Sequence, residues 1–286
     1  RRDEKLLLSE LRDRDHEVTK IDVRKQRFGL ENPPEAFEDV DIVLDRCLAT
    51  SRSLYATEFL SAHDVPVINS HETAKTCADK VTNSLALSEA GVPTPETEVA
   101  FTTETALEIV EDFGYPCVIK PVIGSWGRLL AKIDTRDAAE AILEHKATLG
   151  HYEHKVFYVQ EFVEKPGRDI RVLAVDGEPI ASMVRSSEHW LTNAAQGAET
   201  AAFELDEEAR DLVARASEAV GGGLLGIDLM EIGEALGASR KSSGEGTDPR
   251  EGETEETRNA SQKSSGERND PQTTSAGYTV HEVNHT

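Results

Sequence analysis

The sequence predicts a protein of mixed α/β and α+β class, in which a small parallel unit precedes a larger body of mainly antiparallel strands. Strand-like and helix-like segments alternate over roughly the first seventy residues, which is typical of a parallel sheet covered by helices. Further along, Asp176-Gly177 joins two strand-like segments and is a strong hairpin signal. With 286 residues, 38% of them hydrophobic, the chain can form two domains or three small ones.

The N-terminal unit is predicted to cover residues 1–72. Residues 3–25 have the pattern of a helix followed by a strand. Residues 39–70 have the pattern of a strand, a polar loop, a helix and a second strand. Because Arg1 already lies at a helix start, we expect a first strand of this unit to be absent.

The second unit is predicted to cover residues 73–156. Asp79 should cap a helix that begins at Lys80 and stops at Gly91 and Pro93. The other predicted elements are a strand at 97–101, a helix from Thr103 to Phe113, a hairpin over 114–133 and a helix at 135–150.

The third unit is predicted to cover residues 157–286, with an insertion at 236–277. Its predicted elements are a strand at 155–163, a hairpin over 168–187, a helix at 206–220 and a final strand pair at 224–232 and 278–286. Between the last two strands, Gly237 to Gly277 contain no Val, Ile, Leu, Phe, Tyr or Trp. Such a segment buries too little apolar surface to offset its ordering entropy, so we expect it to be disordered.

Charge and cysteine usage exclude several classes of function. The formal net charge is −23, with 54 acidic and 31 basic residues, which disfavours a nucleic-acid partner. An acidic surface of this kind is typical of a salt-rich cytoplasm, so we expect a halophilic source; an ordinary acidic enzyme is the alternative. The three cysteines show no metal-site or disulfide spacing, and no segment has the pattern of a membrane span or signal peptide. We therefore expect a cytoplasmic protein.

Residues 221–226 match the dinucleotide-binding pattern G-x-G-x-x-G in letters alone. They follow a predicted helix and precede a predicted strand, the reverse of the order that this motif requires. We interpret them as a helix end and turn.

Two lysines and a glycine-flanked loop indicate an anion site of another kind. Lys80 begins a helix, and Lys120 lies within an apolar strand before the loop 124–128. Glycines let backbone N–H groups approach phosphate oxygens closely, and lysines supply point charges. The alternatives are that Lys120 reaches solvent from an edge strand and that Trp126 only packs against the hairpin.

Polar residues on the last two strands suggest a metal site. Asp228 lies on one strand, and Glu282 and Asn284 share one face of its partner. Two carboxylates and an amide oxygen suit Mg²⁺ that is shared with phosphates. By strand alternation, His281 and His285 should point to the opposite face, so neither is predicted as a ligand.

An ordered set of motifs resembles the ATP-grasp ligases, and within them the LysX/ArgX type of the RimK-like branch. The motifs are Lys80, VIKP at 118–121, GSWGR at 124–128, VQEF at 159–162, GRDIRV at 167–172, GIDLME at 226–231 and HEVNH at 281–285. The resemblance covers almost everything outside the insertion. It implies an ATP-grasp fold preceded by a pre-ATP-grasp α/β domain, with the second and third units as its two subdomains.

The resemblance also implies roles for individual residues. Contacts to the ATP phosphates are implied for Lys80, Lys120, Gly124, Ser125, Trp126, Gly127 and Arg128. The adenine and ribose contacts are implied for Glu161, Phe162, Val163 and either Glu164 or Asp169. The remaining assignments are Arg171 and Arg185 on the γ-phosphate and acyl phosphate, Asn193 near the amino acid, and Asp228, Glu282 and Asn284 on two Mg²⁺ ions, with Mn²⁺ as a substitute.

Enzymes of this type join an amino acid to the C-terminal glutamate of a small acidic, LysW-like amino-group carrier protein. The resemblance therefore implies ligation of 2-aminoadipate or glutamate in lysine or arginine biosynthesis, and it allows a homodimer or homotetramer. The alternatives are a glutamate ligase acting on another protein tail or a cofactor, and a truncated, inactive ATP-binding protein. The second alternative arises because family sequence is expected both before Arg1 and after Thr286.

Overall fold

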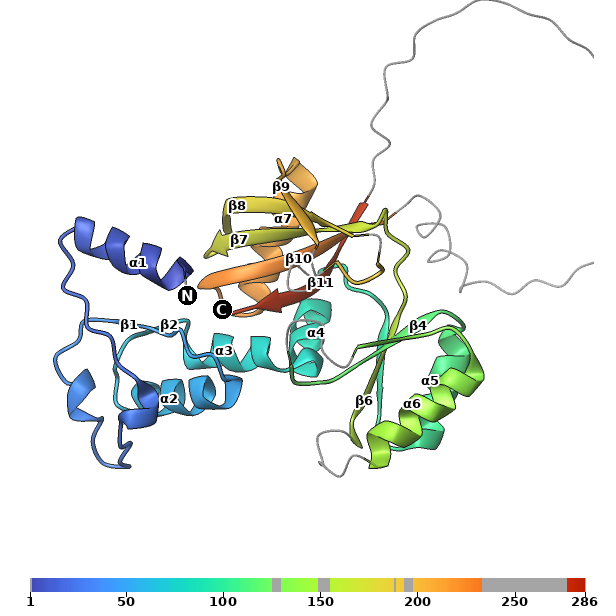
Figure 1. The fold of residues 1–286 in the computed structure, drawn as a ribbon, viewed down its shortest axis with the longest axis horizontal. Helices are drawn as coiled ribbons and strands as arrows, with labels where there is room; N and C mark the ends of the chain where they lie inside the picture. The colour runs from blue at the N-terminus through green and yellow to red at the C-terminus, as the bar shows by residue number, and fades with distance from the viewer. Residues whose placement is uncertain are drawn as a thin grey trace, which may run out of the picture.

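The computed structural model describes residues 2–124, 130–148, 155–187, 189–192, 198–232 and 277–285. In these residues the strands form a two-stranded, a four-stranded and a five-stranded sheet. Helices α3 (His71–Ala78) and α4 (Lys80–Glu89) run between the sheets and connect the N-terminal unit to the rest of the chain (Figure 1). The predicted α/β and α+β class is confirmed.

The N-terminal unit is built around a short parallel sheet. Strands β1 (Val43–Leu44) and β2 (Val67–Ile68) pair in parallel, as predicted, and α2 (Thr50–Ala62) connects them. The remaining elements are α1 (Arg2–Asp13) and the 3₁₀ turns η1 (Val23–Lys25) and η2 (Glu35–Phe37). The strand predicted after α1 is wrong: residues 14–22 form no strand and are followed by η1. A strand needs a hydrogen-bonded neighbour, and this segment has none among the described residues.

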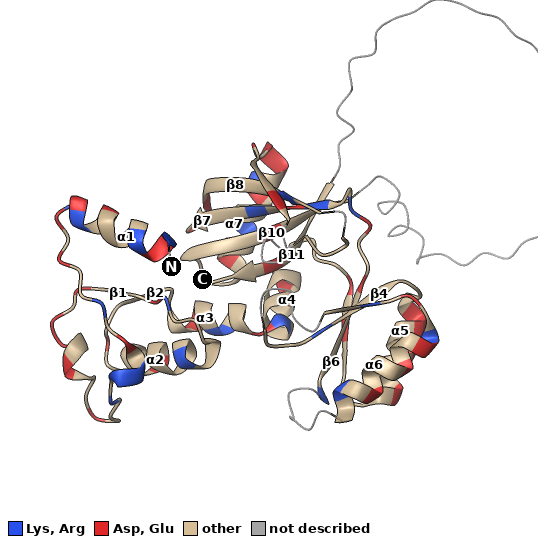
Figure 2. Ribbon diagram, viewed as in Figure 1, with Lys and Arg blue, Asp and Glu red and all other residues tan. Residues whose placement is uncertain are grey.

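The four-stranded sheet carries two helices against one face. Its strands are β3 (Thr97–Ala100), β4 (Cys117–Lys120), β5 (Ala131–Ile133) and β6 (Phe157–Glu161), in the order β3-β6-β4-β5. Helices α5 (Thr103–Phe113) and α6 (Arg136–Thr148) cover it (Figure 1). Ala106, Ile109 and Val110 of α5 are buried in the core of this unit. The opposite side of α5 is acidic and exposed, as the red segments in Figure 2 show.

The five-stranded antiparallel sheet has the order β11-β10-β7-β8-β9. Its strands are β7 (Arg168–Val175), β8 (Glu178–Ser186), β9 (Glu199–Ala202), β10 (Leu224–Ile232) and β11 (Gly277–Asn284), and α7 (Glu207–Ala219) packs against it. Asp176 and Gly177 have φ values of 47° and 84°, which confirms the predicted hairpin turn. Residues 233–276, which include nearly all of the predicted insertion, lie outside the described residues.

Alternation along β10 separates core residues from site residues. Leu225, Ile227 and Leu229 are at most 1% exposed and pack into the core with α7. Because successive strand residues point to opposite faces, Gly226 and Asp228 face the other side of the sheet. The local sequence LLGIDLMEI thus directs one carboxylate to the face away from α7.

A β-bulge changes the expected alternation in β11. Asp228 pairs with Glu282, but the next residue, Leu229, pairs with Val280, so His281 is the extra residue. The prediction that His281 points away from the predicted phosphate site is therefore wrong. Its ring Nε2 lies 3.4 Å from Lys120 Nζ.

Two asparagines fasten the helices of the connecting region to the last strands. Asn69 accepts from Leu224 N at 2.6 Å and donates to the carbonyl oxygens of Leu224 and His285, both at 2.8 Å. Asn83 of α4 bonds both the N–H and the carbonyl of Val283. These contacts replace strand pairing at the sheet edge and fix α4 relative to β11.

In the described part of the chain, no helix is long and apolar enough to span a bilayer.

Candidate active site

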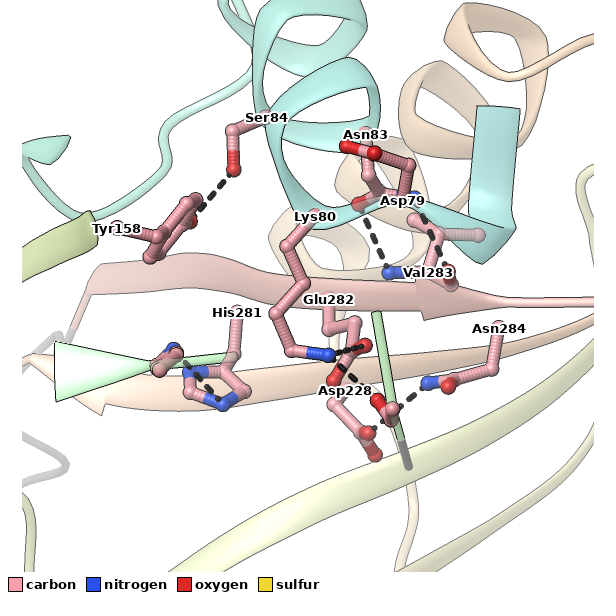
Figure 3. A network of polar contacts seen from close by, with 12 residues as sticks. Asp79, Lys80, Asn83, Ser84, Tyr158, Asp228, His281, Glu282, Val283 and Asn284 are labelled. Atoms are coloured by element: carbon pink, nitrogen blue, oxygen red, sulfur yellow. Dashed lines mark hydrogen bonds and ion pairs between the residues drawn. The ribbon is translucent and has the colours of Figure 1, made fainter. Parts of the chain in front are cut away.

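The predicted site residues that the structure describes come from both larger sheets and from the start of α4. Figure 3 shows the Lys80 side chain running from α4 to Glu282 on β11, with Asp228 and Asn284 close by. Ser125, Trp126, Gly127, Arg128 and Asn193 lie outside the described residues. Most of the predicted phosphate loop and the predicted contact with the amino-acid substrate therefore lie outside the described residues.

Lys80 is held at the first turn of α4. Asp79 caps this helix, as predicted, by accepting from Val81 N at 2.8 Å and Thr82 N at 3.1 Å. The backbone N–H of Lys80 donates to Val122 O at 3.0 Å, which ties the helix start to the segment after β4. The Lys80 ammonium lies 3.0 Å from Glu282 Oε1 and donates to Gly124 O at 2.7 Å.

Lys120 is the last residue of β4 and is only 2% exposed. The solvent-reaching alternative for this residue is therefore wrong. Its ammonium donates to Gln160 Oε1 and lies 5.9 Å from the centroid of the Tyr158 ring. Burial lowers the pKa of Lys120 to about 7, with a further lowering from Lys80 and an opposing effect from Glu282. Binding an anion here would relieve the cost of keeping this group charged.

A compensated ion cluster occupies the site face of β7, β8 and β10. Asp228 accepts from Arg171 Nη1 and from Arg185 Nη2, both at 2.7 Å, and Asn284 Nδ2 lies 3.3 Å from its Oδ2. Arg185 also donates to Asp169 Oδ1 at 2.6 Å. Burial acts to lower the pKa of Arg185, but the two carboxylates raise it above its ordinary value. The cluster holds two guanidinium groups in defined positions with most of their charge balanced.

Gly226 makes room for this cluster. A Cβ atom built at this position would lie 2.7 Å from Cζ of Arg171. The glycine at this position in β10 lets the Arg171 guanidinium lie flat across the strand and reach Asp228. A side chain there would force Arg171 to move.

The predicted nucleotide hinge follows β6. Glu161 Oε1 accepts from Glu96 N at 2.8 Å, and Val163 is buried. The Phe162 ring has Lys132 Nζ 4.7 Å from its centroid. Of the two residues predicted toward the ribose, Glu164 is exposed, whereas Asp169 is buried and also accepts from Thr192.

Some residues of the site are not among those predicted. Lys165 donates to Thr192 Oγ1 at 2.7 Å and lies 3.6 Å from Asp169 Oδ2, and burial lowers its pKa. Gln160 and His281 both contact Lys120. Gln160 lies next to the predicted hinge residue Glu161, and this adjacency was the available signal. His281 carried no such signal, because the bulge that redirects it is a property of strand pairing.

The residues predicted to bind Mg²⁺ supply a fitting set of oxygen donors. Asp228 and Glu282 are paired across β10 and β11, and Asn284 adjoins Asp228. Two carboxylates and an amide suit a hard cation that completes its coordination with phosphate and water oxygens. No cluster of three or more His, Cys, Asp and Glu side chains able to hold a metal occurs among the residues that the structure describes.

Comparison with known sequences identifies the domains. Residues 1–76 match the LysX preATP-grasp domain, and residues 77–239 match the RimK-like ATP-grasp domain. The chain is similar to an "Alpha-aminoadipate--LysW ligase LysX" of Saccharolobus solfataricus, with 38% identity over 68% of this chain and 70% of that protein. It is also similar to a "Glutamate--LysW ligase ArgX" of Sulfolobus acidocaldarius, with 34% identity over 67% and 68% of the two chains.

Comparison with solved structures supports the fold. A RimK domain ATP-grasp protein from Sphaerobacter thermophilus superposes with a TM-score of 0.69 at 23% identity, covering 99% of this chain and 86% of that one. The ATP-grasp ligase PsnB superposes with a TM-score of 0.60 at 19% identity, covering 96% and 84%. The chain has the ATP-grasp fold with a preATP-grasp domain, and it belongs to the RimK-like ATP-grasp family of ATP-dependent carboxylate–amine ligases.

Proposed function

We propose that this enzyme joins the amino group of 2-aminoadipate or glutamate to the C-terminal glutamate of a small, LysW-like amino-group carrier protein. The observation that carries the proposal is the pairing of Asp228 with Glu282 across β10 and β11. This pairing brings Lys80, which binds Glu282, close to Arg171 and Arg185, which bind Asp228. This arrangement suits reactions in which negative charge moves between phosphate and carboxylate oxygens. The substrates follow from the printed names of the LysX and ArgX relatives.

In the first step, a carboxylate oxygen of the carrier attacks the γ-phosphorus of ATP. The bond from that phosphorus to the β-phosphate oxygen breaks, ADP leaves, and an acyl phosphate forms. Lys80 and Lys120 would bind the α- and β-phosphates, and Arg171 and Arg185 would receive the charge that develops on the transferred group. Asp228 contributes by holding both guanidinium groups in place before the nucleotide arrives.

In the second step, the amino nitrogen of the incoming amino acid attacks the acyl carbon. The carbon–oxygen bond to phosphate breaks, inorganic phosphate leaves, and the nitrogen loses a proton as the amide forms. Arg171 and Arg185 would bind the departing phosphate, so this step requires no nucleophilic side chain of the enzyme. Exclusion of water is needed because the acyl phosphate would otherwise hydrolyse.

Asp228, Glu282 and Asn284 would hold the divalent cation. When bound, Mg²⁺ would neutralise phosphate charge and align the phosphates of ATP. Glu282 is paired with Lys80 in this structure, so binding of a cation would make the metal and Lys80 share one carboxylate. We expect two divalent cations to bind at this site.

A second candidate acceptor is a pterin cofactor. The chain is 33% identical to a "Tetrahydromethanopterin:alpha-L-glutamate ligase" of Methanosarcina acetivorans over 66% of this chain and 62% of that protein. The LysX relatives match at higher identity or over more of both chains, which favours the carrier protein.

The decisive experiment is ADP release with ATP, Mg²⁺ and one candidate acceptor at a time. The acceptors are a LysW-like carrier and tetrahydromethanopterin, each with glutamate or 2-aminoadipate, at low and high KCl because of the net charge of −23. We expect release that requires the carrier and one amino acid and is lost in Glu282→Ala. The matched control is Glu108→Ala on the exposed side of α5, which should keep wild-type turnover.

Release with the pterin and not with the carrier would replace the first candidate by the second. If the protein binds ATP but releases no ADP with either acceptor, both candidate functions are contradicted.

A further inference from the structure

The surroundings of Lys120 differ from those of an ordinary buried lysine. Its ammonium donates to Gln160 Oε1, and His281 Nε2 lies at 3.4 Å. Both partners are uncharged acceptors when the histidine is neutral. Within the described residues, no carboxylate lies at ion-pair distance from Lys120, whereas Lys80 has Glu282 at 3.0 Å.

The Gln160 amide is oriented by two hydroxyl groups. Its Nε2 donates to Thr97 Oγ1 at 2.8 Å and to the Tyr158 hydroxyl at 3.0 Å. Tyr158 in turn shares a 2.8 Å hydrogen bond with Ser84 of α4, which Figure 3 shows. Because two acceptors engage the amide nitrogen, the amide oxygen must face Lys120. Gln160, Tyr158 and Lys120 are buried, and the network links α4, β3 and β6 to the end of β4.

The direction of His281 is set by the β-bulge. The extra residue turns the ring toward Lys120 instead of away from it. An ammonium donates hydrogen bonds and cannot accept them, so Nε2 facing it must be the acceptor and Nδ1 carries the ring proton. His281 Nδ1 is buried and has no hydrogen-bond partner among the described residues.

We propose that Gln160 and His281 are positioning residues that hold Lys120 through two uncharged acceptors and leave its third N–H for a nucleotide phosphate. An ammonium has three donors, so two are used for orientation and one remains. A carboxylate in either position would also orient the lysine, but it would neutralise the charge that attracts the phosphate. The inference rests on the proposed contact between Lys120 and ATP.

The sharpest test is Gln160→Glu. The substitution keeps size and one acceptor, and the hydroxyls of Thr97 and Tyr158 can rotate to donate to the new carboxylate. Lys120 then gains a buried counterion. We expect ATP affinity, measured by calorimetry with Mg²⁺ and no carrier, to fall about 10- to 100-fold while the melting temperature stays equal or rises. A purely structural role for Gln160 would instead leave ATP affinity unchanged in a folded variant.

A pair of substitutions at His281 tests the second acceptor. In His281→Gln, the side-chain amide can reach the position of Nε2, whereas in His281→Asn it reaches only the position of Nδ1. We expect His281→Asn to weaken ATP binding about tenfold and His281→Gln to restore it to within about threefold of wild type. The control is His145→Gln on the exposed side of α6, which should bind ATP as the wild type does.

The outcomes separate the two proposals. Wild-type ATP affinity in both Gln160→Glu and His281→Asn overturns the positioning roles and leaves the proposed ligase untouched. Equal weakening in His281→Gln and His281→Asn overturns the role of the Nε2 acceptor. Loss of carrier-dependent ADP release with normal ATP binding would instead count against the proposed acceptor alone.

Discussion

The two larger sheets hold their site cations in different ways. On the five-stranded sheet, Arg171 and Arg185 are bound by Asp228, and Arg185 also by Asp169. On the four-stranded sheet, Lys120 has only neutral partners among the described residues. The first arrangement is rigid before a ligand binds, because each charge already has a partner. The second keeps a buried amine, whose pKa burial lowers to about 7, available to bind an incoming anion in its charged form, at some cost to stability.

Removing the shared carboxylate should have the largest effect. Asp228→Asn keeps the shape of the side chain but leaves two guanidinium groups with less compensation and removes a proposed metal ligand. We expect kcat for ADP release to fall about 10²- to 10³-fold and the free energy of unfolding to fall by about 3 kcal/mol. Steady-state kinetics and urea unfolding would measure the two effects. Near-normal turnover would contradict the view that this cluster organises the site.

Lys120→Met should separate binding from stability. The substitution removes the free charge, so we expect ATP affinity to fall about 10- to 100-fold. At the same time the folded protein should gain stability near neutral pH, because a buried amine is replaced by an apolar side chain of similar length. Calorimetry and thermal unfolding of the same sample would show the two changes in opposite directions. If Lys120→Met loses both ATP affinity and stability, Lys120 stabilises the fold, which contradicts the expected cost of burying it.

The difference in stability between Lys120→Met and the wild type should depend on pH. The pKa of Lys120 is lowered to about 7 in the folded state, so between about pH 7 and 10 the unfolded chain binds a proton that the folded chain does not. The contribution of Lys120 to stability should therefore become less unfavourable as pH rises through this range. Unfolding measured from pH 7 to 10 should show the wild type gaining on Lys120→Met. If the difference in unfolding free energy between the two proteins stays constant over this pH range, burial does not shift the pKa of Lys120.

A smaller effect is expected at the start of α4. Asp79→Ala removes the cap of the helix that carries Lys80, and the expected loss of unfolding free energy is about 1 kcal/mol. ATP affinity should change less than in Lys120→Met, because Lys80 keeps its contacts with Glu282 and Gly124. Asp79→Asn is the matched variant, since asparagine also caps helices and should retain most of the stability. Equal losses in both variants would mean that the carboxylate charge, and not the cap, matters.

The smallest effect is expected for an exposed ion pair on the outside of the four-stranded unit. Arg136 contacts Glu111 at 3.0 Å and Glu140 at 2.9 Å, and all three side chains are at least 40% exposed. Arg136→Ala should change the free energy of unfolding by about 0.5 kcal/mol or less and leave ATP affinity unaltered. A loss above about 1 kcal/mol in urea unfolding would mean that surface pairs of this acidic protein matter more than exposed pairs usually do.

Local sequence signals predicted most of the elements that carry the site. The Asp79 cap, the helix from Thr103 to Phe113 and the Asp176-Gly177 turn were all predicted correctly because each depends on residues within a few positions of one another. The failures involve contacts between distant segments. The strand predicted after α1 has no pairing neighbour in the described chain, and β9 carries little apolar pattern to reveal it.

By itself, the sequence determined the family, the order of the domains, the alternation that sends Asp228 to the site face, and the set of candidate phosphate and metal residues. Those properties follow from residue type and from short-range periodicity. The tertiary structure alone decided that His281 faces Lys120, that Gln160 orients it, and that Asp228 is shared by two arginines. Each of these depends on the register of strands far apart in the chain, where one extra residue reverses the direction of a side chain.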